Sequence, residues 1–404
     1  MNGFFSEPAK QIPVSIECDV LVAGGGFAGI SAALSAARQG AKVLLCEKLY
    51  MLGGLATAGL VSIYLPLCDG QGKQVSFSIA EELLRLSINK GADNVNAHPV
   101  PECWFKEANI TERAKKRYQV QFNPQYFAIA AEQLLISEGV KILYGTSICD
   151  VSVKAGAIDY LIIENKSGRS AIKVKSVVDC TGDSDIFKLA NANTRLHEKG
   201  NVLAAWYYKT ENGKYLLKMH GFADVPESFG KADKPIKDAR YKGVEAEELS
   251  QMTIDSHAAV LTDYLKQGEF SDDRMLATIA TTPQVRMTRK IVGEYTLDYT
   301  EQHKEFSDSI GMVSDWRKAG PIFEIPFRTL YSKSIKNLIT AGRSISVTDD
   351  MWDVTRVIPD CAVTGEAAGA AAAMSDDFGS LDVTALQTVL ENRGVKLHEK
   401  DIDI

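Results

Sequence analysis

Short apolar runs alternate with a longer, alanine-rich run at the start of the chain, and this alternation predicts a βαβ unit. Residues 20–23 and 43–46 are continuously apolar, as expected for strands buried on both faces. The alanine-rich stretch between them has the composition of a helix. Two buried strands joined by a helix form a parallel pair, so residues 16–48 predict the start of a parallel sheet.

A second helix-and-strand pattern follows at residues 123–144. Asn123 is placed to cap a helix whose first turn holds Pro124, and Gly139 is placed to end it. Beyond it, short alternating runs joined by turn residues predict an antiparallel β-meander and then one more buried strand. The meander runs are 148–153, 157–164 and 171–174, and the further strand is 177–179.

Residues 195–330 have a different texture, with more aromatic residues and longer polar loops, and they predict an inserted α+β domain. Strands are predicted at 204–210 and 275–283, helices at 246–267 and 286–302, and a loop at 221–243. After this region come a last apolar strand at 337–340, an alanine- and glycine-rich helix at 359–374 and a tail with a short helix.

The turn after the first strand carries a glycine pattern typical of dinucleotide binding. Gly24, Gly26 and Gly29 have the spacing G-x-G-x-x-G, and Glu47 ends the second strand 23 residues after Gly24. Gly24 permits a tight turn, Gly26 lets backbone approach a pyrophosphate, and Gly29 permits close helix–strand packing. Glu47 can accept hydrogen bonds from ribose hydroxyls. The pattern predicts an adenine dinucleotide site but leaves open which dinucleotide binds.

Composition narrows the function classes. The 404 residues carry a net charge of −7, which disfavours nucleic acid as a partner. No apolar run approaches the roughly 20 residues of a membrane span, and the N-terminus lacks a signal-peptide pattern, so we expect a cytoplasmic protein.

Cysteines and histidines predict no metal site. The seven cysteines form no CxxC pair, and the six histidines have no metal-ligand spacing. Cys361, near a helix start, is open to two interpretations, a thiol of lowered pKa or a buried packing residue, and packing is favoured.

Four blocks of the sequence resemble one family. They are AGGGFAG with Glu47 and Lys48, then LGGLATAG, then VVDCTGDSD, and finally NLITAGRSIS with RVIPDCAVTGEAAGAAAA. The chain resembles the FAD-dependent oxidoreductases of the glutathione-reductase-like superfamily, in the group allied to fumarate reductase and succinate dehydrogenase flavoproteins. The resemblance implies FAD as the cofactor. It also implies the α/β fold class, with a Rossmann-like FAD-binding domain (parallel sheet, helices and a β-meander) and an inserted α+β substrate domain.

The position of the later glycine-rich segments favours FAD independently. A nicotinamide dehydrogenase would complete its binding unit within roughly 150 residues. Here a second glycine-rich strand end, at 341–343, lies some 300 residues downstream, before a helix with Pro359 in its first turn. FAD is an extended molecule, so contacts from both ends of the chain suit it. Gly365 and Gly369 are predicted to let this helix pack closely on the first unit.

The resemblance also implies domain boundaries. The FAD-binding domain is expected in three segments, 14–60, 118–195 and 331–375. A loop and helix insertion is expected at 61–117, the substrate domain at 196–330 and a C-terminal tail at 376–404.

Cofactor-binding residues follow from the same resemblance. The pyrophosphate, ribose, flavin, adenine and pyrimidine-edge contacts are expected from residues spread over these segments. They are Gly24, Gly26, Phe27, Ala28, Gly29, Glu47, Lys48, Gly53, Gly54, Leu55, Ala56, Thr57, Ile148, Thr181, Gly182, Gly342, Arg343, Val357, Ile358, Pro359, Asp360 and Cys361.

The departures from the family pattern carry information too. Covalent members have a histidine beside the second glycine block, which here reads GGLATAG, so non-covalent FAD is expected. No second G-x-G-x-x-G occurs, so electrons are expected to come from, or pass to, an external donor or acceptor.

Charged residues are the candidates for substrate chemistry. Arg356 is the first candidate for anchoring the substrate, and Asp350 and Asp353 are candidates for a base or for its ion partners. Arg286 and Arg289 would bind an anionic substrate or form salt bridges on a helix surface.

The resulting prediction is an FAD-dependent oxidoreductase of the dehydrogenase or reductase type, which transfers a hydride between FAD and a small organic substrate. The alternatives are a flavin-dependent monooxygenase and a flavin-binding electron-transfer subunit without its own substrate. The oligomeric state is not predicted.

Overall fold

A parallel-rich sheet covered by helices organises the chain, which confirms the predicted α/β class. The computed structural model describes residues 3–92, 99–106, 108–221 and 235–402. The sheet has seven strands in the order β5-β2-β1-β8-β7-β6, and β16 also pairs with β8. The strands are β1 (Val14–Ala23), β2 (Val43–Cys46), β5 (Lys141–Leu143), β6 (Ser147–Lys154), β7 (Ala157–Asn165), β8 (Gly168–Asp179) and β16 (Leu338–Thr340).

Strand β8 joins the parallel sheet to the meander. From Ala171 to its end it pairs parallel with β1, its first half pairs antiparallel with β7, and its last residues pair parallel with β16. The sequence predicted two separate strands here, and that division was wrong. Ser176 interrupts the apolar pattern, but it is buried and its hydroxyl donates to the Ala372 carbonyl at 2.7 Å, so a polar residue is tolerated inside one continuous strand.

Helices α1 (Phe27–Arg38) and α8 (Ile358–Met374) pack directly against each other beside the sheet. A Cβ added at Gly365 or Gly369 would lie 2.4 Å from the Ala28 carbonyl oxygen or 2.1 Å from that of Ala32. This contact confirms the predicted close packing of the glycine-containing helix. The Ser31 hydroxyl donates to the Ala362 carbonyl at 2.6 Å and fixes the same interface.

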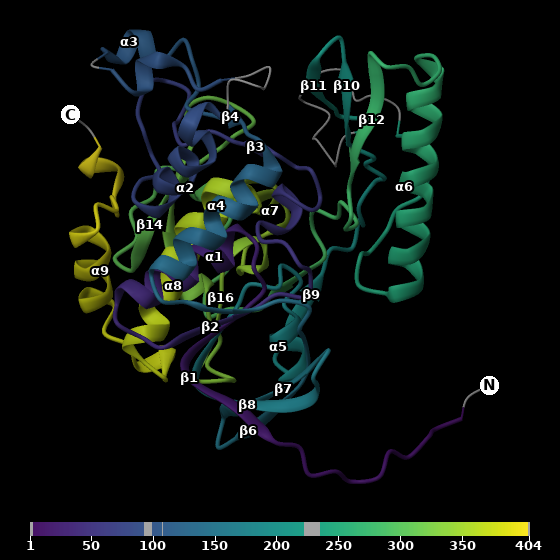
Figure 1. Ribbon diagram of the computed structural model, residues 1–404. Helices are drawn as coiled ribbons and strands as arrows, with labels where there is room; N and C mark the ends of the chain where they lie inside the picture. The colour runs from purple at the N-terminus through teal and green to yellow at the C-terminus, as the bar shows by residue number, and fades with distance from the viewer. Residues whose placement is uncertain (1–2, 93–98, 107, 222–234, 403–404) are drawn as a thin grey trace.

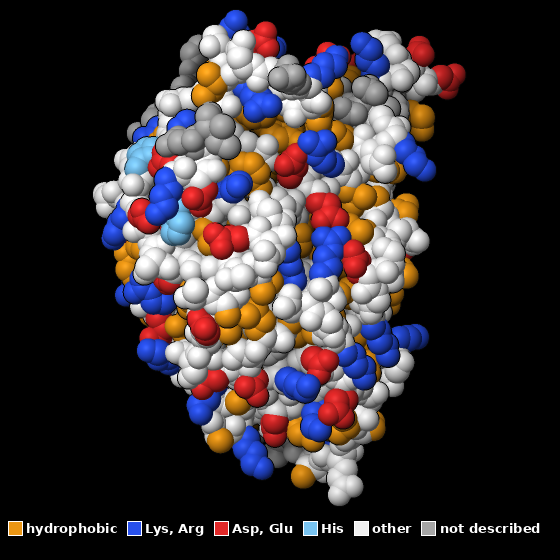
Figure 2. Space-filling model, turned by 90° about the vertical axis from the view of Figure 1, so that its left-hand side faces the viewer, with side chains coloured by type: hydrophobic (Ala, Val, Ile, Leu, Met, Phe, Trp, Pro, Cys, Tyr) orange, Lys and Arg blue, Asp and Glu red, His pale blue; other side chains and the backbone are white. Residues whose placement is uncertain are grey.

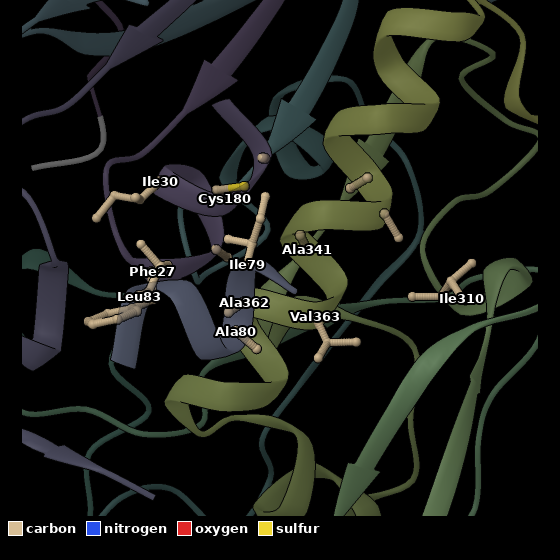
Figure 3. Close-up of a cluster of buried hydrophobic side chains, with 14 of the residues drawn as sticks. Phe27, Ile30, Ile79, Ala80, Leu83, Cys180, Ile310, Ala341, Ala362 and Val363 are labelled. Carbon is tan, nitrogen blue, oxygen red and sulfur yellow. The ribbon is translucent and has the colours of Figure 1, made fainter. Parts of the chain in front are cut away.

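Further helices cover the core around this pair. Helix α2 (Ile79–Ile88) contributes Ile79, Ala80 and Leu83 to the buried cluster drawn in Figure 3. Helix α4 (Pro124–Ser137) begins as predicted, because the Asn123 side chain accepts hydrogen bonds from two backbone N–H groups of its first turn. The remaining helices of this part are α3 (Ile110–Arg113), α5 (Asp185–Leu189), α7 (Asp349–Thr355) and α9 (Val383–Asn392).

The middle of the chain forms smaller sheets of its own. Strands β10 (Tyr207–Glu211), β11 (Lys214–Lys218) and β12 (Arg274–Ile279) make a three-stranded antiparallel sheet beside α6 (Ala246–Lys266). Figure 1 shows them on the side of the molecule opposite α9. Shorter pairs are β3 (Ile63–Tyr64) with β4 (Val120–Gln121), and β14 (Ser309–Ser314) with β15 (Ile322–Pro326). Most of the loop predicted at 221–243 lies outside the described residues.

The helix predicted at 286–302 was wrong. Residues Arg289–Ile291 form strand β13, which pairs antiparallel with β9 (Thr194–Leu196), and a short 3₁₀ turn covers Tyr299–Glu301. Close packing explains the difference, because a Cβ added at Gly293 would lie 2.9 Å from the Ser346 Cβ. A helix here would not fit this close approach of the chain to residues 328–346.

The surface carries charges of both signs. Figure 2 shows Lys, Arg, Asp and Glu side chains interspersed over the face that includes α9. Among the described helices, none combines the length and the apolar character needed to cross a bilayer.

Candidate functional site

A cavity of about 370 Å³ opens where the parallel strands end. Its wall includes Ala23 and Cys46, which end β1 and β2, and Cys180 and Ala341, which directly follow β8 and β16. Ligands of open α/β sheets bind at this carboxyl edge. The first turns of α1 and α8 also line the cavity, and both bring the positive end of a helix dipole to it.

The three fingerprint glycines have distinct roles in the turn between β1 and α1. Gly24 has φ +98°, and an added Cβ would lie 2.6 Å from the Cys180 carbonyl oxygen. A Cβ on Gly29 would lie 1.8 Å from the Gly24 carbonyl oxygen, so Gly29 permits helix and strand to touch. Gly26 differs, because a Cβ there would meet no protein atom within 4 Å. Open space over a backbone that lines the cavity fits a bound pyrophosphate group.

Glu47 is buried and held in one orientation at the cavity wall. Its Oε2 accepts from the Gly25 N–H at 2.6 Å, and its Oε1 accepts from the Leu49 N–H at 2.8 Å. Each carboxylate oxygen keeps a second lone pair, so the geometry fits further bonds from ribose hydroxyls. Lys48 lines the cavity next to it.

The second glycine block lies against the first. Gly53 has φ +97° and its N–H donates to the Gly25 carbonyl at 2.8 Å. Gly54, Leu55 and Ala56 line the cavity beside it. Thr57 does not, since its side chain is buried and its hydroxyl donates to the Leu52 carbonyl.

Distant segments complete the wall. Five predicted residues from outside the two glycine blocks also line the cavity, namely Ile148, Thr181, Gly182, Gly342 and Arg343. The Arg343 guanidinium donates to the Gly182 carbonyl (2.6 Å), to the Val285 carbonyl (3.1 Å) and to Asp183 (2.7 Å). It therefore ties three segments of the wall together.

The start of α8 is divided between cavity and core. Ile358 and Cys361 line the cavity, whereas Val357, Pro359 and Asp360 are buried behind it, as is Gly29 on α1. Burial raises the pKa of the Cys361 thiol to about 12, which supports packing over a reactive thiolate. Burial also raises the pKa of Asp360 well above its ordinary value.

The candidate catalytic residues are not all brought together. Arg356 lines the cavity, and its Nε donates to Asp353 at 2.8 Å. Asp350 is exposed on α7. Arg289 does not line the cavity itself, but it donates at 3.3 Å to Asp185, which does. Arg286 is buried just behind the wall, directly after Val285.

Several residues of the site were missed in the sequence. Arg317 donates to Asp353 at 3.3 Å and to Asp315 at 2.9 Å, so an ionic chain runs from Asp315 to Arg356. No spacing in the sequence signals that chain. Missed cavity-lining residues come from the strand-end motif and from the middle of the chain. They are Ala23, Cys46, Leu49, Thr146, Ser147, Cys180, Asp183, Asp185, Ile186, Gly243, Leu249, Thr282, Pro283, Val285 and Ala341.

The sheet, the glycine turn and the cavity at the strand ends define a dinucleotide-binding protein. The chain belongs to the FAD dependent oxidoreductase family, whose pattern matches residues 19–205 and 201–390. FAD is the cofactor of this family, and the open space at Gly26 and the oriented Glu47 carboxylate fit it. The protein is therefore an FAD-dependent oxidoreductase.

Individual proteins are similar to this chain to a lesser extent. A fumarate reductase (cytochrome) of Shewanella frigidimarina is 40% identical over 81 residues, which are 19% of this chain and 14% of that protein. A geranylgeranyl bacteriochlorophyll reductase-like structure from Thermoplasma acidophilum has 14% identity and a TM-score of 0.47, covering 94% of this chain and 84% of that one. A p-nitrophenol 4-monooxygenase from Pseudomonas putida has 11% identity and a TM-score of 0.47, with the same coverage.

Proposed function

We propose that this protein transfers a hydride between non-covalently bound FAD and a small organic substrate, as a dehydrogenase or reductase. One observation carries the proposal. A single cavity is lined by the fingerprint turn and also by Arg356 and by Val285 of the middle region. It therefore joins the expected cofactor site to the region expected to hold the substrate.

FAD would be held largely by backbone. Gly24, Gly26 and the first turn of α1 would receive the pyrophosphate, and Glu47 the ribose. The other cavity-lining residues of the predicted set would surround the rest of the molecule. Gly29, Thr57, Val357, Pro359 and Asp360 would support that wall from behind. No histidine lines the cavity among the described residues, in keeping with a non-covalent cofactor.

When bound, FAD supplies a ring that accepts or gives up a hydride. The chain's own residues would orient the substrate and exclude water. Arg356 would bind the substrate, and Asp353 would hold Arg356 in place through its 2.8 Å hydrogen bond. Asp353 also accepts from Arg317, and a carboxylate held by two guanidinium groups is fixed in place, which suits it to positioning Arg356.

The proposal has further parts. The chain would belong to the glutathione-reductase-like superfamily and be allied to the fumarate reductase flavoproteins. Residues 196–330 would form the substrate domain. An external donor or acceptor would complete the electron balance.

A flavin-reduction screen tests the proposal. The purified FAD-loaded protein is mixed without oxygen with small hydroxy, amino and unsaturated acids and with sugars, first with oxidised and then with reduced flavin. We expect at least one compound to bleach or restore the visible flavin absorbance. In a separate incubation of the reduced protein with isotope-labelled O2, a product that incorporates the label would instead establish a monooxygenase. No response to any compound in either experiment would favour an electron-transfer subunit.

A further inference from the structure

Three arginines lie close together at the end of the cavity formed by the start of α8. Arg356 lines the wall, Arg343 lines it nearby, and Arg286 is buried directly behind Val285. Burial lowers the pKa of Arg286 to about 9, and the positive charges of Arg356 and Arg343 act in the same direction, whereas the Asp353 carboxylate acts against them. Arg286 is therefore near enough to both other guanidinium groups to be repelled by them.

The carboxylates that pair with these arginines are already engaged, and burial raises the pKa of Asp360, another carboxyl at the start of α8, well above its ordinary value. Arg343 forms an ion pair with Asp183. Arg356 and Arg317 both form ion pairs with Asp353. Arg317 is paired a second time, with Asp315. Four guanidinium groups, Arg286 included, thus share three carboxylates, and one positive charge remains.

That remaining charge belongs to Arg286. Its Nη1 donates to the Gln284 carbonyl at 3.0 Å, and its guanidinium lies over the Trp206 ring at 5.4 Å. Its Nη2 is buried and has no hydrogen-bond partner among the described residues. No carboxylate of the described part of the chain contacts it.

A buried charge without a counter-ion costs several kcal/mol, so it persists where a ligand of opposite charge completes the site. The N-terminus of α8, whose Ile358 and Cys361 line the same part of the wall, favours an anion as well. A single excess positive charge matches a singly charged group. A carboxylate also has the planar shape that a guanidinium binds with two hydrogen bonds.

We propose that Arg356 and Arg286 form an anion subsite for a carboxylate group of the substrate. Arg356 meets the carboxylate at the cavity wall, and Arg286 supplies charge from behind it. This inference rests on the proposed function, because it assigns a chemical class to the substrate of that reaction. Arg286 is the specificity residue, since its charge distinguishes a carboxylate from a neutral group of the same shape.

Binding without turnover tests the subsite. Sodium propionate and the neutral, similarly shaped propionamide are titrated into the oxidised FAD-loaded protein at constant ionic strength, and the flavin difference spectrum is followed. We expect propionate to bind about tenfold more tightly than propionamide. Arg286→Met and Arg356→Met should each weaken propionate binding by about fivefold or more and change propionamide binding by less than about twofold.

Matched variants separate charge from folding. Arg328→Met removes a guanidinium that pairs with Asp308 away from the cavity, and it should bind propionate as the wild type does. Arg356→Lys keeps the charge and should retain part of the affinity. Each variant is first shown to hold FAD, and Arg356→Met tests the subsite if Arg286→Met does not fold.

Equal affinity for the two probes would overturn the inference, as would no saturable propionate binding to fully FAD-loaded protein. The inference would also be overturned if Arg286→Met changed only the ionisation of the reduced flavin. The negative charge that Arg286 meets would then belong to the cofactor. A neutral compound that reduces the flavin while propionate fails to bind would leave the proposed function standing. If propionate binds but no compound exchanges a hydride with the flavin, the anion subsite would stand and the proposed function would fail.

Discussion

Two regions of the cavity wall are built in different ways: the fingerprint end, around Gly26 and Glu47, and the α8 end, around Arg356. At the fingerprint end the wall is mainly backbone, and the important property of Gly24, Gly26 and Gly29 is the side chain that they lack. At the α8 end the wall depends on side chains, with Arg356 held by Asp353 and Arg286 behind it. One end suits a constant ligand, whereas the other is open to change through a few charged residues.

The difference also lies in how far apart the parts are in the chain. The glycine turn lies inside the βαβ unit of residues 14–46, and Glu47 directly follows that unit. The cationic end draws Arg286, Arg317 and Arg356 from three separate segments. A site built from residues close together in the chain can be recognised in the sequence. A site built from distant segments is brought together only by folding.

Substitution of two fingerprint glycines gives the largest expected effect and separates folding from cofactor binding. Gly29→Ala should lower the free energy of unfolding by at least about 4 kcal/mol, because its Cβ would strike the Gly24 carbonyl. Gly26→Val should leave the apoprotein within about 1 kcal/mol of wild type, since Gly26 has an ordinary φ of −70° and open space beside it. FAD affinity of Gly26→Val should fall at least about a hundredfold, roughly 2.7 kcal/mol.

Chemical denaturation of the apoproteins and a fluorescence titration with FAD provide the two measurements. Wild-type FAD affinity in Gly26→Val would contradict the assignment of the pyrophosphate to this turn. A stable Gly29→Ala apoprotein would contradict the packing argument.

The contrast between the ends explains what the sequence could predict. The βαβ unit, the meander and the close packing of α8 on α1 were predicted because each follows from local periodicity or from a glycine that only one geometry explains. The helix predicted at 286–302 failed because Gly293 packs against a distant segment, which no local pattern reveals.

The site shows the same limit. Of the charged candidates, Arg356 and Asp353 meet in the structure because they share one turn, whereas Asp350 is turned to solvent. Arg317 escaped prediction because its partner Asp353 lies 36 residues away, and ion pairs carry no spacing rule. Charge clusters of this kind need the fold before they can be recognised.

The next largest effect is expected from removing the carboxylate of Asp353, which Arg317 and Arg356 share at the α8 end. Asp353→Asn should lower the free energy of unfolding by about 3 kcal/mol, because Arg317 and Arg356 would lose a buried counter-charge. Asp350→Asn is the matched control on the same helix and should stay within about 0.5 kcal/mol, because Asp350 is exposed. Urea denaturation of the two variants measures both values. Equal stability of the pair would show that the ionic chain does not hold this end together.

The last expected effect, similar in size to that of Asp353→Asn, concerns α8, which packs against α1 and begins at the cavity. It appears as a dependence of stability on pH. Burial raises the pKa of Glu366 to about 7, although Ser78 and the Ile79 N–H donate to its carboxylate. Because the folded pKa lies above that of an unfolded glutamate, the folded state binds more protons, and stability is greatest below about pH 4.5 and falls as pH rises through 7. The loss should be on the order of 3 kcal/mol.

Glu366→Gln isolates this contribution, because glutamine keeps an oxygen acceptor and does not titrate. Asp179, whose pKa burial raises to about 6, acts in the same direction in both proteins and cancels in their difference. The difference in unfolding free energy between wild type and variant should therefore change between pH 4.5 and 8. Glu366 does not line the cavity, so the same slope is expected with and without FAD. A slope that appears only in the FAD-loaded protein would mean that the two ends communicate through the charge inside α8, and parallel curves would mean that Glu366 stays ionised throughout.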